Sequence, residues 1–365
     1  MVFTMKNISS RVVFTCGREP QYQRNTLILD ALKQSFEVVE VTNDSRWLTV
    51  RYLYLYCKLA RILKKPVDLV VTGFLGQPLI PFIRKFTQAP ILFDAFLSVY
   101  DTLSYERQAF KPGSLFGRLA YRLDQSSCEK STLVTLDTNE HTRYFAETFH
   151  IPENKLKSVF VGCSENIFFP RSKNPSTPTV LFYGSFLPLQ GVNTIVLAAK
   201  LLEEVCPLRF SLIGDGPTKG HINQMIKTLK IKNIDVLPPI PLTELPKYIS
   251  QAMICLGGHF GSAEKARRVI AGKTYQMIAM GRPTIVGDNP ANKELLTHGY
   301  DSWFCPMDNP EALADSILHL FKTPDLRDEL SANAPRTFQM RASQEVLSPI
   351  WQELARSLLP SNSSE

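Results

Sequence analysis

Short apolar runs alternate with helical patterns along the first half of the chain. Six of these runs are predicted to be strands, at residues 11–16, 36–41, 67–72, 90–93, 133–138 and 157–163. Unbroken apolar runs of this length are typical of strands that are buried on both faces of a parallel sheet. Since helical segments separate most of them, the pattern predicts βα units around one parallel sheet.

The same pattern begins again after a segment that is rich in proline. Residues 169–178 (FPRSKNPSTP) contain three prolines, a composition typical of a linker. Beyond it, strands are predicted at residues 179–183, 209–213, 234–237, 253–256 and 284–286. We therefore predict an α/β fold with two doubly wound, Rossmann-like domains at residues 1–170 and 171–345, followed by a helical segment at 346–365 with a frayed tail.

The stretch from residue 257 to residue 288 carries the strongest chemical signal. Three glycines, a cluster of cations and a short helix at 274–280 follow one another there. The glycines are Gly257, Gly258 and Gly261, and the cations are Lys265, Arg267, Arg268 and Lys273. A glycine loop exposes backbone N–H groups, and a helix N-terminus adds positive potential. This combination favours a diphosphate site, although a solvated basic face with turn glycines would give the same residues.

Polar residues also follow the strands of the first half, where ligands of parallel sheets bind. Gly17, Arg18 and Arg24 follow the first strand, and Asn25 is predicted to cap a helix at 26–34. The arginines fit either a ligand site or a solvated loop. Asp94 follows the fourth strand directly, and Asp101 lies in the loop beyond it with Arg107. These aspartates are placed to bind sugar hydroxyls or accept a proton, and Asp101 is equally placed to cap a helix.

Residues 46–65 (RWLTVRYLYLYCKLARILKK) form a basic amphipathic helix in this interpretation. The segment holds six cations, no acid, one tryptophan and three tyrosines. Such a helix suits an anionic membrane surface. An ordinary surface helix that packs its apolar stripe on the sheet is an equally natural interpretation. Nucleic acid is a third, although no basic stripe repeats elsewhere.

Composition narrows the class of protein further. The 365 residues are 44% hydrophobic and 21% charged, as in soluble globular proteins. No apolar run is long enough for a transmembrane helix, and the N-terminus lacks a signal peptide pattern. Seven scattered cysteines without a C-x-x-C pair argue against disulfides and structural zinc, and favour a cytoplasmic location.

The distribution of charge and the spacing of glycines argue against two alternative functions. The net charge of +7 is concentrated in residues 1–170, where 21 Lys and Arg stand against 16 Asp and Glu. The second half is therefore close to neutral, and no aromatic RNA-binding motif is present, which argues against a nucleic-acid binder. No strand is followed by G-x-G-x-x-G, which argues against a nicotinamide dehydrogenase.

Several segments of the second half resemble the donor-binding domain of family 4 glycosyltransferases, which have the GT-B fold. They lie at residues 183–202, 210–217, 237–257, 260–288 and 293–296. Residues 93–107 and 136–145 are similar to a branch of this family that builds bacterial envelope polysaccharides. The resemblance implies a retaining hexosyltransferase that needs no metal or other cofactor. It would move a sugar from a nucleotide diphosphate to a glycan or lipid-linked acceptor, as a cytoplasmic protein at the inner membrane face.

The resemblance also implies roles for individual residues. The donor would contact Gly184, Ser185, Gly214, Ile240, Gly261, Lys265, Arg268, Lys273 and Gln276. The diphosphate would lie against Gly184, Ser185 and the three cations, the base near the backbone of Ile240, and the ribose near Gln276. Catalytic roles fall to Asp94, Asp101, Lys265 and Lys273. Acceptor contacts fall to Gly17, Arg18, Arg24, Asp101 and Arg107 in the first domain. The last helix is expected to cross back to that domain.

The chain departs from the family pattern at several positions, among them Ala271 and Gly272, where one branch often has Pro-Asn. Ser185 and Gln190 stand where arginine and lysine are usual, and Gln276 and Arg268 stand where glutamates are usual. A neutral glutamine holds a hydroxyl less strongly than a carboxylate does. An inactive GT-B scaffold or partner subunit that binds nucleotide sugar without turnover is therefore the alternative interpretation.

Overall fold

The structure is a computed structural model, and it describes residues 10–107, 109–171 and 178–359. By its contacts the chain divides into two compact units. Unit 1 comprises residues 1–137, 142–159 and 347–365, and unit 2 comprises residues 138–141 and 160–346. Most of the predicted linker, residues 172–177, lies outside the described residues. Both units are layered α/β folds, as the alternation of apolar runs and helices predicts.

The sheet of unit 1 has six parallel strands in the order β2-β1-β3-β4-β5-β6. They are β1 (Arg11–Thr15), β2 (Glu37–Val41), β3 (Leu69–Thr72), β4 (Ile91–Asp94), β5 (Leu133–Leu136) and β6 (Leu156–Ser158). All six overlap predicted strands, although β6 ends at Ser158 and shares only two residues with the strand predicted at 157–163. The side chains of β3, β4 and β5 are all buried, because helices pack on both faces of the sheet.

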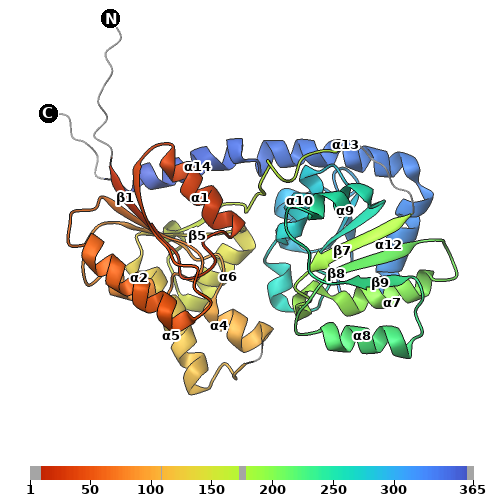
Figure 1. Cartoon of the computed structure of the whole chain (residues 1–365), viewed down its shortest axis with the longest axis horizontal. Coiled ribbons are helices and arrows are strands. Elements are labelled where there is room, and N and C mark those ends of the chain that lie inside the picture. The colour runs from red at the N-terminus through yellow and green to blue at the C-terminus, as the bar shows by residue number, and fades with distance from the viewer. Residues whose placement is uncertain (1–9, 108, 172–177, 360–365) are drawn as a thin grey trace, which may run out of the picture. The chain divides into compact units, whose positions relative to one another are not determined.

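Helices connect these strands (Figure 1). They are α1 (Gln23–Lys33), α2 (Leu48–Ile62), α3 (Leu79–Ile83), α4 (Val99–Asp101), α5 (Leu115–Lys130) and α6 (Asn139–Phe149). A π-helical turn, η1 (Thr102–Glu106), follows α4, and a 3-10 turn, η2 (Glu153–Lys155), precedes β6. The last helix, α14 (Gln344–Ser357), lies beside α1, where the Gln352 amide donates a hydrogen bond to the Ala31 carbonyl at 3.1 Å.

Unit 2 contains a second six-stranded parallel sheet, in the order β12-β11-β10-β7-β8-β9. Its strands are β7 (Thr179–Gly184), β8 (Arg209–Gly214), β9 (Ile234–Leu237), β10 (Ile254–Gly258), β11 (Thr284–Gly287) and β12 (Trp303–Cys305). Its longer helices are α7 (Val192–Leu202), α8 (Lys219–Thr228), α9 (Leu245–Gln251), α10 (Gly272–Ala279), α11 (Pro290–Leu295), α12 (Pro310–Lys322) and α13 (Pro324–Arg341). Two 3-10 turns, η3 (Pro188–Gln190) and η4 (Glu264–Arg267), lie in its loops.

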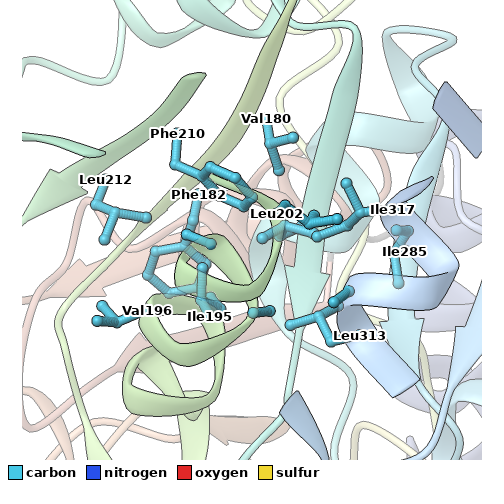
Figure 2. Packing of buried hydrophobic residues seen from close by; sticks show 14 of the residues in the cluster. Val180, Phe182, Ile195, Val196, Leu202, Phe210, Leu212, Ile285, Leu313 and Ile317 are labelled. Atoms are coloured by element: carbon cyan, nitrogen blue, oxygen red, sulfur yellow. The ribbon is translucent and has the colours of Figure 1, made fainter. Parts of the chain in front are cut away.

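The core of unit 2 forms between the sheet and helices α7 and α12 (Figure 2). Phe182 and Phe210 project from neighbouring strands toward Ile195 of α7, and Leu313 and Ile317 of α12 close the other side. All five side chains are fully buried. Burying each of them contributes about 1.5–3 kcal/mol, so this layer fixes the strand ends from which the loops of unit 2 start.

Three details of the predicted elements are wrong. Asn25 lies inside α1, which begins at Gln23, and its side chain instead accepts a hydrogen bond from the Phe74 N–H at 3.1 Å. Ser98 rather than Asp101 caps α4, because the Ser98 hydroxyl accepts a hydrogen bond from the Asp101 N–H at 2.8 Å. Strand β12 was not predicted at all.

Candidate functional site

The topology of unit 2 identifies where a ligand can reach the sheet. From β7 the chain moves to β8 and β9 on one side, and then crosses to β10, β11 and β12 on the other. The direction of winding therefore changes between β7 and β10, which pair in parallel. Ligands of doubly wound sheets bind at such a switch point, beyond the carboxyl ends of the strands. Gly184 ends β7 at this edge and Ser185 follows it, and Gly261 lies in the loop that follows β10.

The loops at this edge approach one another too closely for side chains. Gly184 and Gly214 are paired residues at the ends of β7 and β8. A Cβ atom on Gly214 would lie 1.9 Å from the Gly184 carbonyl oxygen, and one on Gly216 would lie 1.8 Å from that of Ser185. Both glycines also have φ near +150°, a region open to glycine alone. The backbone of the first two loops is therefore fixed in place, with Ser185 exposed beside it.

The loops after β7 and β10 are joined by backbone hydrogen bonds. The Gly261 N–H donates to the Leu189 carbonyl at 3.1 Å, and the Phe260 N–H donates to the Gln190 carbonyl at 3.3 Å. A Cβ atom on Gly261 would lie 2.3 Å from the Pro188 carbonyl oxygen, so glycine is required for this contact. These contacts therefore hold the backbone at the switch point in a fixed position.

Lys273 is the most unusual charged residue of this region. It lies in the first turn of α10, and its side chain is only 7% exposed. Its Nζ atom lies 4.1 Å from the centre of the Phe182 ring and has no hydrogen-bond partner among the described residues. Burial lowers the pKa of this ammonium from 10.5 to about 7. A buried cationic group without an anion is costly, and the arrangement is therefore suited to receiving one.

His259 lies next to Lys273 in the same region, and the sequence analysis gave it no role. The side chain is 6% exposed, and its Nδ1 atom has no hydrogen-bond partner among the described residues. Burial, followed by the charges of Lys273 and Lys265, lowers its pKa to about 3. His259 is therefore neutral near pH 7, and it offers a hydrogen bond rather than a charge.

Gln276 is held from within unit 2. The Tyr183 hydroxyl at the end of β7 donates a hydrogen bond to the Gln276 side-chain oxygen at 2.6 Å, and both residues are buried. Tyr183 was not predicted as a site residue, and the sequence gives no signal for a contact between positions 93 residues apart. The bond fixes the orientation of the amide on the helix face that also carries Lys273.

Gln190 occupies the space above Gly184. A Cβ atom on that glycine would lie 2.5 Å from the Gln190 Oε1 atom. The side chain is 8% exposed, and Oε1 has no hydrogen-bond partner among the described residues. A neutral, buried amide thus lies at the end of β7, where the family pattern implies a lysine.

The remaining predicted donor residues lie around the same edge. Lys265 and Arg268 are half-buried, in and directly after η4. Ile240 follows β9, the edge strand two positions from β7. At the usual strand spacing it is therefore roughly 10 Å along the sheet edge from the switch point. The structure thus brings Gly184, Gly214, Gly261, Lys273 and Gln276 together, and places Ile240 farther along.

Two predicted residues of unit 1 pair with each other. The Arg24 guanidinium donates two hydrogen bonds to the Asp94 carboxylate through Nε and Nη2, at 2.8 Å each. Exposed fractions of 2% and 0% show that neither side chain faces solvent. Arg24 also donates to the Val159 carbonyl at 2.7 Å and lies 5.3 Å from the Trp351 ring. The pair is an internal connection of unit 1 that the sequence analysis did not foresee, and a role for either residue in acceptor binding or proton transfer stays a prediction.

The other predicted residues of unit 1 differ in their exposure. Gly17 is buried after β1, where its N–H donates to the Phe74 carbonyl at 2.9 Å. Asp101 is also buried, at 2% exposed. Arg18 and Arg107 are exposed, and Arg18 forms a surface ion pair with Glu19 at 2.9 Å. Of this set, only the two arginines present charge at the surface.

In the part of the chain that the structure describes, no three His, Cys, Asp or Glu side chains are grouped so as to hold a metal ion. No helix within residues 10–107, 109–171 or 178–359 is long and apolar enough to cross a membrane.

A model of a known protein family matches most of unit 2. Residues 164–337 match the family model of the glycosyl transferases group 1. The matched segment contains the whole sheet of unit 2 and every predicted donor residue. A comparison with curated protein sequences gives no significant match.

Solved glycosyltransferase structures share the fold of both units. HepE from Anabaena, determined in complex with UDP-glucose, is 13% identical with a TM-score of 0.73, over 95% of this chain and 99% of that one. Sucrose-phosphate synthase from Thermosynechococcus elongatus is 15% identical with a TM-score of 0.75, over 96% and 99%. A glycosyltransferase from Rickettsia africae is 15% identical with a TM-score of 0.68, over 97% and 100%. The chain therefore has the GT-B fold, as the sequence analysis predicted.

Proposed function

We propose that the protein is a retaining glycosyltransferase that takes its sugar from a nucleotide diphosphate bound at the switch point of unit 2. The observation that carries this proposal is the buried Lys273 ammonium, which has no hydrogen-bond partner among the described residues. A diphosphate would supply the missing anion. The match of residues 164–337 to the group 1 glycosyl transferases and the UDP-glucose bound by HepE support this choice of ligand.

Each residue of the site has a distinct task in this proposal. Lys273, Lys265 and Arg268 stabilise the negative charge that develops on the departing diphosphate. His259 supplies a neutral hydrogen bond beside them. Gln276, oriented by Tyr183, binds a ribose hydroxyl. The departing phosphate itself takes the acceptor proton, so no protein nucleophile is required.

We propose further that transfer needs no metal and that the acceptor is a glycan or a lipid-linked sugar of the cell envelope. The three cations support the first point, because they can neutralise a diphosphate without help. The similarity of residues 93–107 and 136–145 to the envelope-polysaccharide branch supports the second. Acceptor contacts then fall to unit 1, where Arg18 and Arg107 are exposed.

A second candidate is a protein that binds nucleotide sugar without turnover. It is favoured by the neutral amides of Gln190 and Gln276, both 8% exposed, at positions where the family resemblance implies charges. The two candidates share the donor site and differ in chemistry. Release of free nucleoside diphosphate in the presence of a glycan acceptor therefore separates them.

The direct test of donor binding is a thermal-shift panel of nucleoside diphosphates and nucleotide sugars, each with magnesium and with a chelator. A ligand at 100 times its dissociation constant should raise the melting temperature by roughly 5–10 °C. We expect one base to give this shift equally in both conditions. A shift that vanishes with the chelator would overturn metal independence, and a panel without any shift would overturn the donor site.

Donor affinity should depend on pH through Lys273. Its pKa in the free protein is about 7, and a bound diphosphate raises that pKa, so binding above pH 7 must be accompanied by uptake of one proton. We expect the affinity for UDP-glucose to be constant below pH 7 and to fall by up to about tenfold per pH unit above it. The nucleotide sugar is the right probe, because free UDP adds a terminal phosphate whose own pKa is about 6.

Calorimetry at pH 8 in two buffers of different ionisation enthalpy measures this proton directly. The Lys273→Arg variant is the control, since arginine stays charged throughout the range. Its affinity should not depend on pH between 7 and 9. An unchanged pH dependence in this variant would show that another group takes up the proton.

A further inference from the structure

The exposed apolar side chains of unit 1 are concentrated in a few elements. Five of the large ones belong to the start of α2, and we call them the α2 cluster: Trp47, Leu48, Val50, Leu53 and Tyr54. Three belong to the first turns of α5, and we call them the α5 cluster: Leu115, Phe116 and Leu119. The α5 cluster is the more prominent, with Leu115 and Phe116 exposed to 70% and 65%. Scattered exposed apolar residues need no explanation, but groups of this kind mark interaction sites.

The two clusters lie in the same layer of unit 1. Helix α2 leads from β2 to β3 and α5 leads from β4 to β5, and right-handed crossovers in the same direction place both on one face of the sheet. Helix α3 contacts both of them, and Figure 1 shows α2 and α5 on the same side of the strands. Helix α2 starts soon after β2 ends, and α5 starts after α4 and η1, which follow β4. Because both helices return antiparallel to the strands, their first turns, which carry the clusters, lie on the carboxyl side of the sheet.

Helix α2 is apolar on two opposite sides. Leu55 and Leu59 are fully buried against the sheet, which accounts for an ordinary amphipathic helix. Val50, Leu53 and Tyr54 lie on the other side, with exposed fractions between 41% and 66%. A helix with a second apolar face is typical of one that packs against something else.

Cations predominate around both clusters, and Asp44, three residues before Trp47, is an exposed acid beside the α2 cluster. Residues 46–65 contain six cations and no acid, and Arg46, Arg61, Lys64 and Lys65 are exposed. Residues 107–122 likewise contain no acid, and all four of their cations, Arg107, Lys111, Arg118 and Arg122, are exposed. The nearest acids on either side of this second segment, Glu106 and Asp124, are buried.

The aromatic residues of α2 are coupled to its cations. The Arg46 guanidinium lies 5.2 Å from the Trp47 ring, and the Lys58 ammonium donates a hydrogen bond to the Tyr54 hydroxyl at 3.0 Å. Tryptophan and tyrosine with adjacent cations are the side chains that favour the boundary between lipid headgroups and acyl chains.

We propose that the α2 and α5 clusters together dock unit 1 on an anionic phospholipid surface. The apolar side chains enter the headgroup boundary, and the surrounding cations contact lipid phosphates. The charges argue for lipid over a second copy of the chain, because two copies meeting through this face would bring like charges together. This surface lies outside the donor site, so vesicle binding can be measured without a nucleotide.

The experiment measures binding of the full chain to vesicles. Vesicles of neutral phosphatidylcholine are compared with vesicles that contain 30% anionic phosphatidylglycerol, at about 0.05 M and 0.5 M salt. We expect binding only to the anionic vesicles, and weaker binding at high salt. The Arg118→Gln, Arg122→Gln double variant should lose roughly 25-fold in partitioning, since each cation near the surface is worth about fivefold.

A second variant tests the α5 cluster by its apolar side chains alone. Replacing Leu115, Phe116 and Leu119 by serine leaves every charge in place and should weaken binding by roughly 100-fold. The matched control is Leu201→Ser with Val205→Ser, two exposed apolar side chains of unit 2, and it should bind as the wild type does. Because all five positions are exposed, each variant should keep the wild-type melting temperature.

Three results would overturn the proposal. One is an absence of binding to anionic vesicles at low salt. Another is equal binding by the wild type and the Leu115, Phe116 and Leu119 variant. The third is a wild type that is dimeric in sedimentation while that variant is monomeric, because the face would then belong to a second copy.

Discussion

Replacing Lys273 with methionine should weaken donor binding and stabilise the free protein at the same time. Methionine fills a similar volume but carries no charge. A charged hydrogen-bonding group that contacts a ligand contributes about 1.5–3 kcal/mol, so donor affinity should fall by roughly 10- to 150-fold. In the free protein the same change removes a buried amine that has no hydrogen-bond partner among the described residues.

The stabilising half of this result follows from burial. Leaving a buried polar group unsatisfied costs about 1–3 kcal/mol. Burial also disfavours the charged form of Lys273, and this is why its pKa is lowered. Unfolding releases the lysine to its ordinary pKa, so the wild type should gain stability as pH rises from 7 toward 10.5, and the methionine variant should lack this gain.

Thermal unfolding with and without a nucleotide sugar measures both changes in one experiment. We expect the variant to melt at a higher temperature alone and to show little shift with ligand. Lys227→Met is the control, because Lys227 is an exposed cation of helix α8, which belongs to the same unit. A variant that melts lower while keeping its ligand shift would make Lys273 a structural residue and remove it from the donor site.

The fold could be predicted from sequence because its signal is local. Buried parallel strands appear as apolar runs, and eleven of the twelve strands were found in this way. Strand β12 was missed, since it has only three residues and lies at the edge of its sheet. The bounds of helix α5 were not predicted for a related reason. Its exposed face carries the apolar Leu115, Phe116 and Leu119, which obscures the apolar and polar periodicity that identifies a helix.

The site could be predicted only as far as its chemistry depends on residue type and order. Glycines and cations that follow a strand are typical of an anion site, and this pattern drew attention to Lys273, whose contact with a donor stays a prediction. The contacts that orient the site are not local. Tyr183 reaches Gln276 from a different strand end, and Arg24 meets Asp94 across 70 positions. No spacing rule connects such pairs, because the sheet topology alone brings them together.

The Arg24 and Asp94 pair should give the largest stability effect in the chain. Removing one partner of a buried ion pair costs about 3–5 kcal/mol, because it leaves an uncompensated buried charge. We expect this cost for Arg24→Met and for Asp94→Leu. The double variant should cost clearly less than the sum of the two, since no lone charge is left behind.

Trp351 provides the measurement. Its ring is 1% exposed and lies 5.3 Å from the Arg24 guanidinium, so its fluorescence reports the unfolding of unit 1. The chain has three tryptophans, and replacing Trp47 and Trp303 by phenylalanine leaves Trp351 as the sole reporter. Urea unfolding in this background then gives the free energy of unfolding for each member of the double-mutant cycle.

Unit 2 offers a matched pair with the same chemistry at the surface. Arg209 contacts the Asp235 carboxylate at 2.8 Å, as Arg24 contacts Asp94, but these side chains are 46% and 52% exposed. The Arg209→Met variant breaks this surface pair and should lower the free energy of unfolding by less than about 1 kcal/mol. The fluorescence of Trp303 measures this change in a background in which Trp47 and Trp351 are replaced. Equal costs for the two pairs would contradict the burial argument. A stable Asp94→Leu variant that binds donor but has lost transfer would instead support a catalytic role for Asp94, because the contacts of its carboxylate with Arg24 and with the Thr135 hydroxyl lie inside unit 1 and should affect only the stability of that unit.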